Sequence, residues 1–93
     1  MIIYIAGEIT GLPERLYKQK FADAEQMLKD EGHTVLNPTV LPPNMPQEKY
    51  LPICLAMLSQ ADAIFTLDNW VDSNGAKIEK AFADYQGKIW YNL

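Results

Sequence analysis

Short apolar runs alternate along the chain with stretches in which apolar residues recur at helical spacing. The first run, Ile2–Ala6, is continuous and ends at Gly7, as is typical of a buried parallel strand. In the first helical stretch apolar residues return every three or four positions until Gly32, a residue that commonly ends helices. The pattern predicts strands at residues 2–6, 33–37, 62–67 and 88–92, and helices at residues 16–31, 48–60 and 73–86.

This alternation predicts an α/β fold in which helices cover both faces of a parallel sheet. Right-handed crossovers favour a three-layer, flavodoxin-like or Rossmann-like single domain over residues 1–93, with a short four-stranded sheet in the order 2-1-3-4. In that order the first helix lies on one face and the other two lie on the opposite face. The third and fourth strands then lack a helix on one side, and we expect another copy of the chain to cover them in a homodimer or higher homo-oligomer.

Composition narrows the classes of partner. The 93 residues are 48% hydrophobic and carry a formal net charge of −4, which argues against binding to polymeric nucleic acid. The sequence has no apolar stretch of about 18 residues and no charged leader, so we expect a cytoplasmic protein without a membrane span. With one His and one Cys, neither a metal site nor another cofactor is expected. Cys54 lies in the apolar run "ICLAML" and is interpreted as a buried core thiol.

Candidate site residues gather in the loops that follow the first and third predicted strands. Ligands of open parallel sheets bind outside the carboxyl ends of the strands, where the strand order reverses. The segments expected to meet there are "GEITGLPER", the Pro-rich stretch 38–46 and "DNWVDSNG". A small-molecule ligand at this edge is expected to contact Gly7, Glu8, Thr10, Asn37, Trp70, Asp72, Ser73 and Gly75.

The start of the third predicted helix has features of a binding site. Ser73 is a favourable N-cap, and Gly75 leaves first-turn backbone N–H groups unshielded, where anions or sugar hydroxyls bind. Glu79 leans back toward this helix start, beside an expected inward stripe that includes Ile78 and Phe82. Two interpretations remain open at this point. Glu79 is either a partly desolvated nucleophile or general base, or an ordinary solvated helix residue.

The aromatic residues also leave alternatives open. Trp70 is placed either to stack on a nucleobase or to anchor its loop or a dimer contact. Trp90 and Tyr91 lie on the last, edge strand, where burial in a dimer is favoured over contact with a ligand.

Three sequence patterns carry a resemblance to a known family. The patterns "IYIAG.ITG", "GHTVLNP" and "ICLAML..ADAIF.L..W.DS.GA..E...A...GK" resemble a small phage and prophage family of unknown function, DUF4406-like, which is related to the nucleoside 2-deoxyribosyltransferases. The likeness extends in order over nearly the whole chain. It implies cleavage or transfer at the N-glycosidic bond of a 2′-deoxynucleoside or its 5′-monophosphate, without a metal.

The resemblance also implies roles for individual residues. Glu79 falls at the position of the nucleophile, which attacks C1′ and forms a glycosyl-enzyme. Tyr4 corresponds to a tyrosine that positions this glutamate, and Asp62 corresponds to an aspartate near the nucleobase. Ser73 corresponds to a phosphate-contacting serine of related nucleotide glycosidases. Protonation of the leaving base is expected from a second acid, Asp62 or Asp72.

The chain departs from the family pattern at several positions. Lys77 and Ala81 stand where the superfamily often has glycine, and Glu8 and Thr10 stand where the nucleotide glycosidases use serine and arginine to hold a phosphate. An additional carboxylate such as that of Glu8 repels a phosphate. The alternative function is therefore a catalytically inactive protein that binds a nucleotide or ribosyl ligand.

Overall fold

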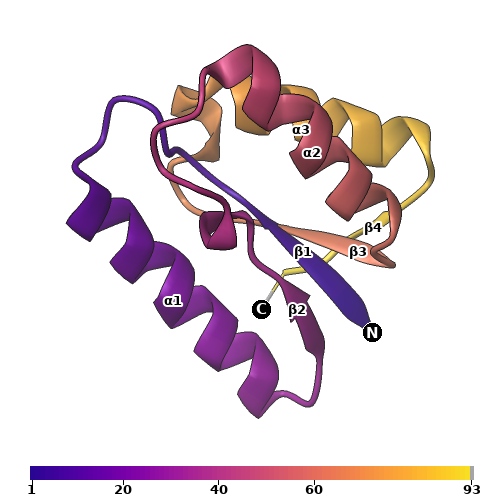
Figure 1. Ribbon diagram of the computed structural model, residues 1–93. Coiled ribbons are helices and arrows are strands. Elements are labelled where there is room, and N and C mark those ends of the chain that lie inside the picture. Colours follow the sequence, from indigo (N-terminus) through magenta and orange to yellow (C-terminus); the bar gives the residue numbers. More distant parts are fainter. Residues whose placement is uncertain (93) are drawn as a thin grey trace.

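The structure, a computed structural model, describes residues 1–92 as a three-layer α/β fold (Figure 1). Strands and α-helices alternate along the chain, and two short 3₁₀ helices lie in the loops at the carboxyl end of the sheet. The elements are β1 (Ile2–Ala6), α1 (Glu14–Asp30), β2 (Thr34–Leu36), η1 (Pro38–Val40), α2 (Gln47–Ser59), β3 (Ala63–Thr66), η2 (Trp70–Asp72), α3 (Asn74–Tyr85) and β4 (Ile89–Trp90).

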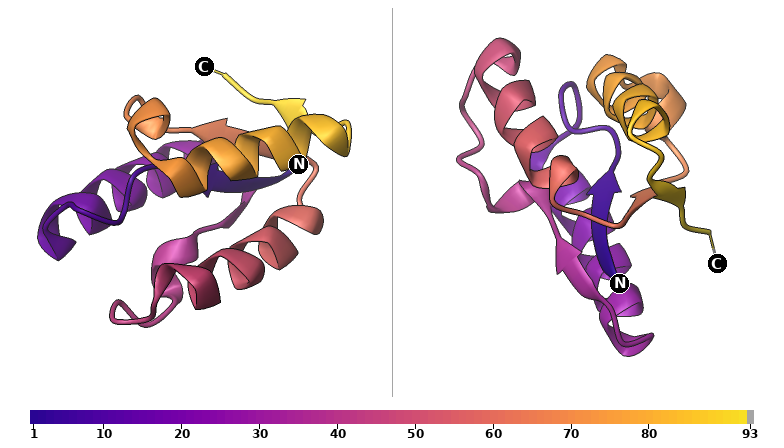
Figure 2. Two further views of the ribbon diagram at one scale, coloured as in Figure 1. Left: turned by 90° about the horizontal axis from the view of Figure 1, so that it is seen from above. Right: turned by 90° about the vertical axis from the view of Figure 1, so that its right-hand side faces the viewer.

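The sheet has the topology that the sequence predicts. Its four strands are parallel and lie in the order β2-β1-β3-β4, so the predicted fold class and strand order are confirmed. Helix α1 covers one face over β1 and β2, and helices α2 and α3 cover the other face (Figures 1 and 2). Within residues 1–92, no helix combines the length and the apolar composition that a membrane crossing requires.

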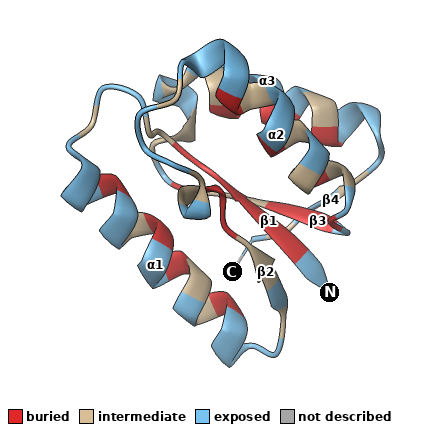
Figure 3. Cartoon of the chain, in the orientation of Figure 1, coloured by how far each residue is buried: buried red, intermediate tan, exposed pale blue. Residues whose placement is uncertain are grey.

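Strand β1 lies at the centre of the sheet and supplies side chains to both apolar layers. Ile3 and Ile5 pack toward α1, whereas Tyr4 and Ala6 pack toward α2 and α3. All four side chains are fully buried, which explains the continuous apolar run (Figure 3). The alternation of the strand therefore directs the phenolic group of Tyr4 to the side of the sheet that carries Glu79.

The predicted helical boundaries need small corrections. Helix α1 begins at Glu14, directly after Pro13, and not at residue 16. Pro52 lies in the interior of α2. A proline there cannot donate the usual backbone hydrogen bond, so the packing of α2 against the sheet offsets a local cost of helix formation.

The face that α3 turns toward the sheet differs from the predicted one. Ile78 was expected to point inward, but it is 47% exposed. The buried positions include Ala76, Glu79 and Ala83. Small alanine side chains allow the helix backbone to approach the sheet closely, and this rotation places Glu79 on the inward face.

The uncovered part of the sheet lies beside α1, on the face opposite α2 and α3. A groove of about 300 Å³ runs between α1 and β3, and its floor includes the half-buried side chain of Phe65. Ile89 on β4 is 52% exposed. The homodimer expected to cover this face stays a prediction.

Candidate functional site

A pocket of about 350 Å³ opens at the carboxyl ends of β1 and β3. Its walls come from the loop after β1, the Pro-rich segment with the start of α2, and the first turns of α3. This is the edge at which the sequence predicts a site, where the strand order reverses. Of the residues expected there, the structure brings together Tyr4, Gly7, Thr10, Ser73, Gly75 and Glu79.

Glu79 is the buried acidic residue of this pocket. Only 6% of the residue is exposed, and Tyr4, which is fully buried, donates a hydrogen bond of 2.6 Å from its hydroxyl group to Oε2. The two residues lie on different elements, and the central position of β1 fixes the phenol under the carboxylate. The interpretation of Glu79 as an ordinary solvated helix residue is therefore wrong.

Burial dominates the ionisation of this carboxyl group. It raises the pKa of Glu79 to about 7, although the Tyr4 hydroxyl and the nearby Cys54 thiol each lower that pKa in part. Burial also raises the pKa of Tyr4 well above its ordinary value and that of Cys54 to about 11. Near neutral pH both forms of Glu79 are populated, and the ionised form suits a nucleophile or a general base.

Three segments meet at the mouth of the pocket around Gln47. The Thr10 hydroxyl donates a 2.8 Å hydrogen bond to Oε1 of Gln47, at the start of α2. On its other side, Nε2 of Gln47 would lie 2.8 Å from a Cβ atom added at Gly75. Ser73 caps α3 by accepting a 3.1 Å hydrogen bond from the backbone N–H of Ala76. The absence of a side chain at Gly75 therefore allows α2 and α3 to close the pocket together.

Asp62 does not reach this pocket. It is exposed, and its carboxylate accepts a 2.8 Å hydrogen bond from the backbone N–H of Ile2. Because β1 and β3 are parallel, the starts of both strands lie at the edge opposite the pocket. Asp72 is exposed in η2 and does not line the pocket either. Neither aspartate is placed beside Glu79 as a second acid.

Glu8 and Trp70 also lie outside the pocket lining. The backbone N–H of Glu8 donates to the side chain of Asn69, which ties the loops after β1 and β3 together. Trp70 packs edge-to-face on Trp90, with ring centroids 6.0 Å apart. The alternative that Trp70 anchors its loop is therefore the one that the structure supports.

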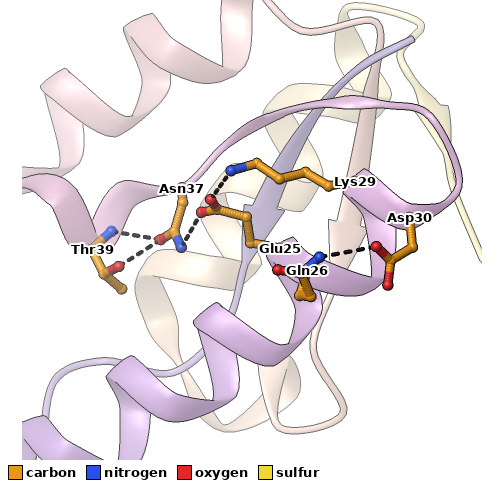
Figure 4. A network of polar contacts seen from close by, with 6 residues as sticks. All are labelled: Glu25, Gln26, Lys29, Asp30, Asn37 and Thr39. Atoms are coloured by element: carbon orange, nitrogen blue, oxygen red, sulfur yellow. Dashed lines mark hydrogen bonds and ion pairs between the residues drawn. The ribbon is translucent and has the colours of Figure 1, made fainter.

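Asn37 has a structural role at the end of β2 (Figure 4). Its carbonyl oxygen accepts hydrogen bonds from the backbone N–H and the hydroxyl of Thr39, which caps η1. Its amide group donates a 2.9 Å hydrogen bond to the carboxylate of Glu25, and this carboxylate also pairs with Lys29. The side chain is thus engaged by α1 and η1, outside the pocket.

Helices α1 and α2 contribute polar groups to the pocket that the sequence pattern did not indicate. Tyr17, Tyr50, Cys54 and Gln47 line the pocket. Tyr17 and Tyr50 lie on apolar helix faces and are buried, and the structure confirms that Cys54 is a buried free thiol. For the two tyrosines, the sequence signal was a hydroxyl-bearing side chain on the core-facing side of a helix, close to the carboxyl edge of the sheet. In residues 1–92 the side chains form no cluster of three or more potential metal ligands.

Comparisons with known proteins agree with this fold. Residues 1–91 match the family described as "Domain of unknown function (DUF4406)". Among curated proteins, none matches the chain. A solved structure, "2-desoxiribosyltransferase from Leishmania mexicana", superposes with a TM-score of 0.69 at 21% identity, over 96% of this chain and 61% of that one. This likeness shows the fold, and the chain corresponds to less than two thirds of that structure.

Proposed function

We propose, from the premise that this chain belongs to the DUF4406 family, that it cleaves or transfers at an N-glycosidic bond. The substrate class is a 2′-deoxynucleoside or its 5′-monophosphate, and the nucleophile is Glu79. The observation that carries the proposal is the buried carboxylate of Glu79, hydrogen-bonded to Tyr4 in a pocket at the carboxyl edge of the sheet. The related fold of a deoxyribosyltransferase supports the same class of reaction.

In this mechanism the ionised Glu79 attacks C1′ of the sugar as the base departs. Bond cleavage develops positive charge on the sugar ring, which a carboxylate held against C1′ stabilises. Tyr4 acts as a positioning residue, because its hydroxyl holds one carboxylate oxygen and orients the other. Water or a second base then attacks C1′ of the covalent intermediate and regenerates Glu79.

An assay of base release tests the proposal. The protein is incubated with each 2′-deoxynucleoside and each 5′-monophosphate, with and without a second free base, and products are separated by chromatography. Glu79→Gln is expected to lose release or exchange by roughly 10³-fold or more, because the amide cannot act as the nucleophile. Glu25→Gln on α1 is the matched control and is expected to retain activity. Equal activity of Glu79→Gln and the wild type contradicts the proposal.

A catalytically inactive ligand-binding protein is the second candidate. The observation that favours it is the position of Asp62 and Asp72, which leaves the pocket without the expected second acid. A protein of this kind shifts its melting temperature with nucleosides or nucleotides, because a ligand of the folded state stabilises it, but releases no base. The release assay and a thermal-shift series therefore separate the two candidates.

A further inference from the structure

The charged side chains that line the pocket are all acidic. Its lining includes the carboxylates of Glu79 and Glu14 but, among the described residues, no Lys or Arg side chain. Glu14 lies at the exposed rim and pairs with Lys18 at 3.0 Å. Glu79 lies inside, and no cation contributes to its pKa. Above neutral pH the interior of the pocket therefore carries a negative charge without a protein counter-ion.

Apart from Glu79 itself and Glu14 at the exposed rim, the described lining of the pocket has no carboxylic acid that could protonate a leaving base. A neutral purine or pyrimidine leaves as an anion unless an acid protonates it. The hydroxyl of Tyr4 is donated to Glu79, and that of Tyr50 to the carbonyl of Pro38 at 3.4 Å. The pKa of Cys54 is about 11, and the remaining phenol, Tyr17, belongs to a weaker class of acid than a carboxylic acid.

These two observations point to one class of substrate. We propose that the preferred substrate is a 2′-deoxynucleoside whose base already carries a fixed positive charge at its glycosidic nitrogen, as in a pyridinium 2′-deoxynucleoside. The proposal rests on the function proposed above and narrows its substrate. A ring of this kind supplies the counter-ion that the carboxylate of Glu79 lacks, and it needs no proton in order to leave.

The reaction balances without a general acid. A carboxylate oxygen of Glu79 forms a bond to C1′, and the C1′–N bond breaks with its electron pair passing to the glycosidic nitrogen. That pair neutralises the positive charge, so the base departs as a neutral molecule. Water then bonds to C1′, the bond from C1′ to the Glu79 oxygen breaks, and one proton is released to solvent. The products are the free base, the free sugar and the carboxylate of Glu79.

The same charge distribution disfavours a 5′-phosphate. A phosphate near the carboxylate of Glu79 raises the free energy of both groups, and no Lys or Arg of the lining offsets that repulsion. A pyridinium ring has the opposite effect, since a nearby positive charge favours the ionised carboxylate. Nucleosides are therefore expected to be better substrates than their monophosphates.

Turnover of matched substrates tests the proposal. Nicotinamide 2′-deoxyriboside is compared with neutral purine and pyrimidine 2′-deoxynucleosides at about pH 8, and spontaneous release is subtracted. We expect kcat/KM to be at least about 100-fold higher for the pyridinium nucleoside, and to increase as the pH rises through the pKa of Glu79. Equal or faster release from the neutral nucleosides overturns the charge proposal. Release that survives Glu79→Gln overturns the proposed function instead.

Binding of uncleavable probes keeps the charge proposal testable in the absence of turnover. 1-Methylnicotinamide is a pyridinium cation, and 3-methylbenzamide is its neutral counterpart of the same shape. Titrations of ¹⁵N-labelled protein at about pH 8 are expected to show at least about tenfold tighter binding of the cation, and this preference disappears in Glu79→Gln. Equal affinity for the two probes, or no binding of the cation, overturns the proposal.

Discussion

Two glutamates on the helices of this molecule have opposite surroundings. Glu25 on α1 pairs with Lys29 at 2.6 Å and receives a hydrogen bond from Asn37, so its pKa lies below the ordinary value (Figure 4). Glu79 on α3 receives a hydrogen bond from Tyr4, but burial without a cation raises its pKa to about 7. The same residue type thus stabilises a loop at one place and forms a reactive group at the other.

The comparison shows that solvent and counter-ions, more than the hydrogen bond, distinguish the two sites. Each carboxylate accepts a hydrogen bond from a side chain outside its own helix, from Tyr4 at 2.6 Å for Glu79 and from Asn37 at 2.9 Å for Glu25. Only Glu79 is buried, and only Glu25 has an ammonium group beside it. When burial makes the ionisation of a carboxyl group unfavourable, a cationic ligand or transition state is expected to stabilise its ionised form most.

The largest expected effect is on stability when Glu79 is neutralised. The folded-state pKa of Glu79, about 7, is raised above its ordinary value of 4.5, so its contribution to stability is fully present below about pH 4.5 and is lost as the pH rises through 7. Glu79→Gln should therefore be more stable than the wild type by about 3 kcal/mol at about pH 8, and nearly equal to it at about pH 4. Urea unfolding at both pH values measures this difference. A difference that does not change with pH contradicts the account.

The next effect comes from the hydrogen bond beneath the carboxylate. Tyr4→Phe removes the donor to Oε2, and we expect the pKa of Glu79 to rise further, by about one unit, with the low-pH limb of activity moving by the same amount. Tyr17→Phe is the matched control, since it removes a pocket hydroxyl that is not bonded to Glu79. If the acidic side of the pH–activity profile is unchanged in Tyr4→Phe, or shifts equally in both variants, the proposed role of Tyr4 is wrong.

Neutralising Glu25 should change the free energy of unfolding less than neutralising Glu79, and with the opposite pH dependence. The lowered pKa of Glu25 means that its contribution to stability is present above its ordinary pKa and is lost as the pH falls through the folded-state value. Glu25→Gln should lower the free energy of unfolding by about 0.5–1 kcal/mol near neutral pH. Urea unfolding of both proteins at neutral and acidic pH measures this loss of stability. A loss that becomes larger toward acidic pH contradicts the prediction.

The smallest effect is expected from the partner of Glu25. Lys29→Met removes an exposed ion pair within one helix and should cost about 0.3–0.5 kcal/mol, less at high salt. The comparison of thermal unfolding at low and high salt isolates this contribution. A loss above about 2 kcal/mol would show that the pair is not the solvent-screened contact that its exposure indicates.

The sequence predicted those features that depend on local pattern. Continuous apolar runs, helical spacing and right-handed crossovers were sufficient for the parallel sheet and its order, and the start of α3 indicated Ser73 and Gly75. For Glu79 the residues left two interpretations open, and the family resemblance favoured the nucleophile. The position of Tyr4 under Glu79 follows from strand alternation once α3 is known to lie on that face. That Glu79 acts as a nucleophile stays a prediction.

The misplaced residues share a physical cause, because their positions depend on packing between distant elements. Asp62 begins a strand, and only the direction of that strand in the sheet determines that it lies opposite the pocket. The inward face of α3 is set by Ala76 and Ala83, whose small size is a weaker apolar signal than the exposed Ile78. Asn37 was assigned to the site, but its partners on α1 and η1 lie outside the pocket.

The most direct test of the account is the titration of the two carboxyl groups by ¹³C NMR, with Glu79 and Glu25 assigned from their Gln variants. The account predicts that the Glu79 side chain titrates with a midpoint near 7, while that of Glu25 titrates below its ordinary pKa. If Glu79 instead titrates below about 5, its carboxyl group is solvated or paired, and the distinction between the two sites is wrong.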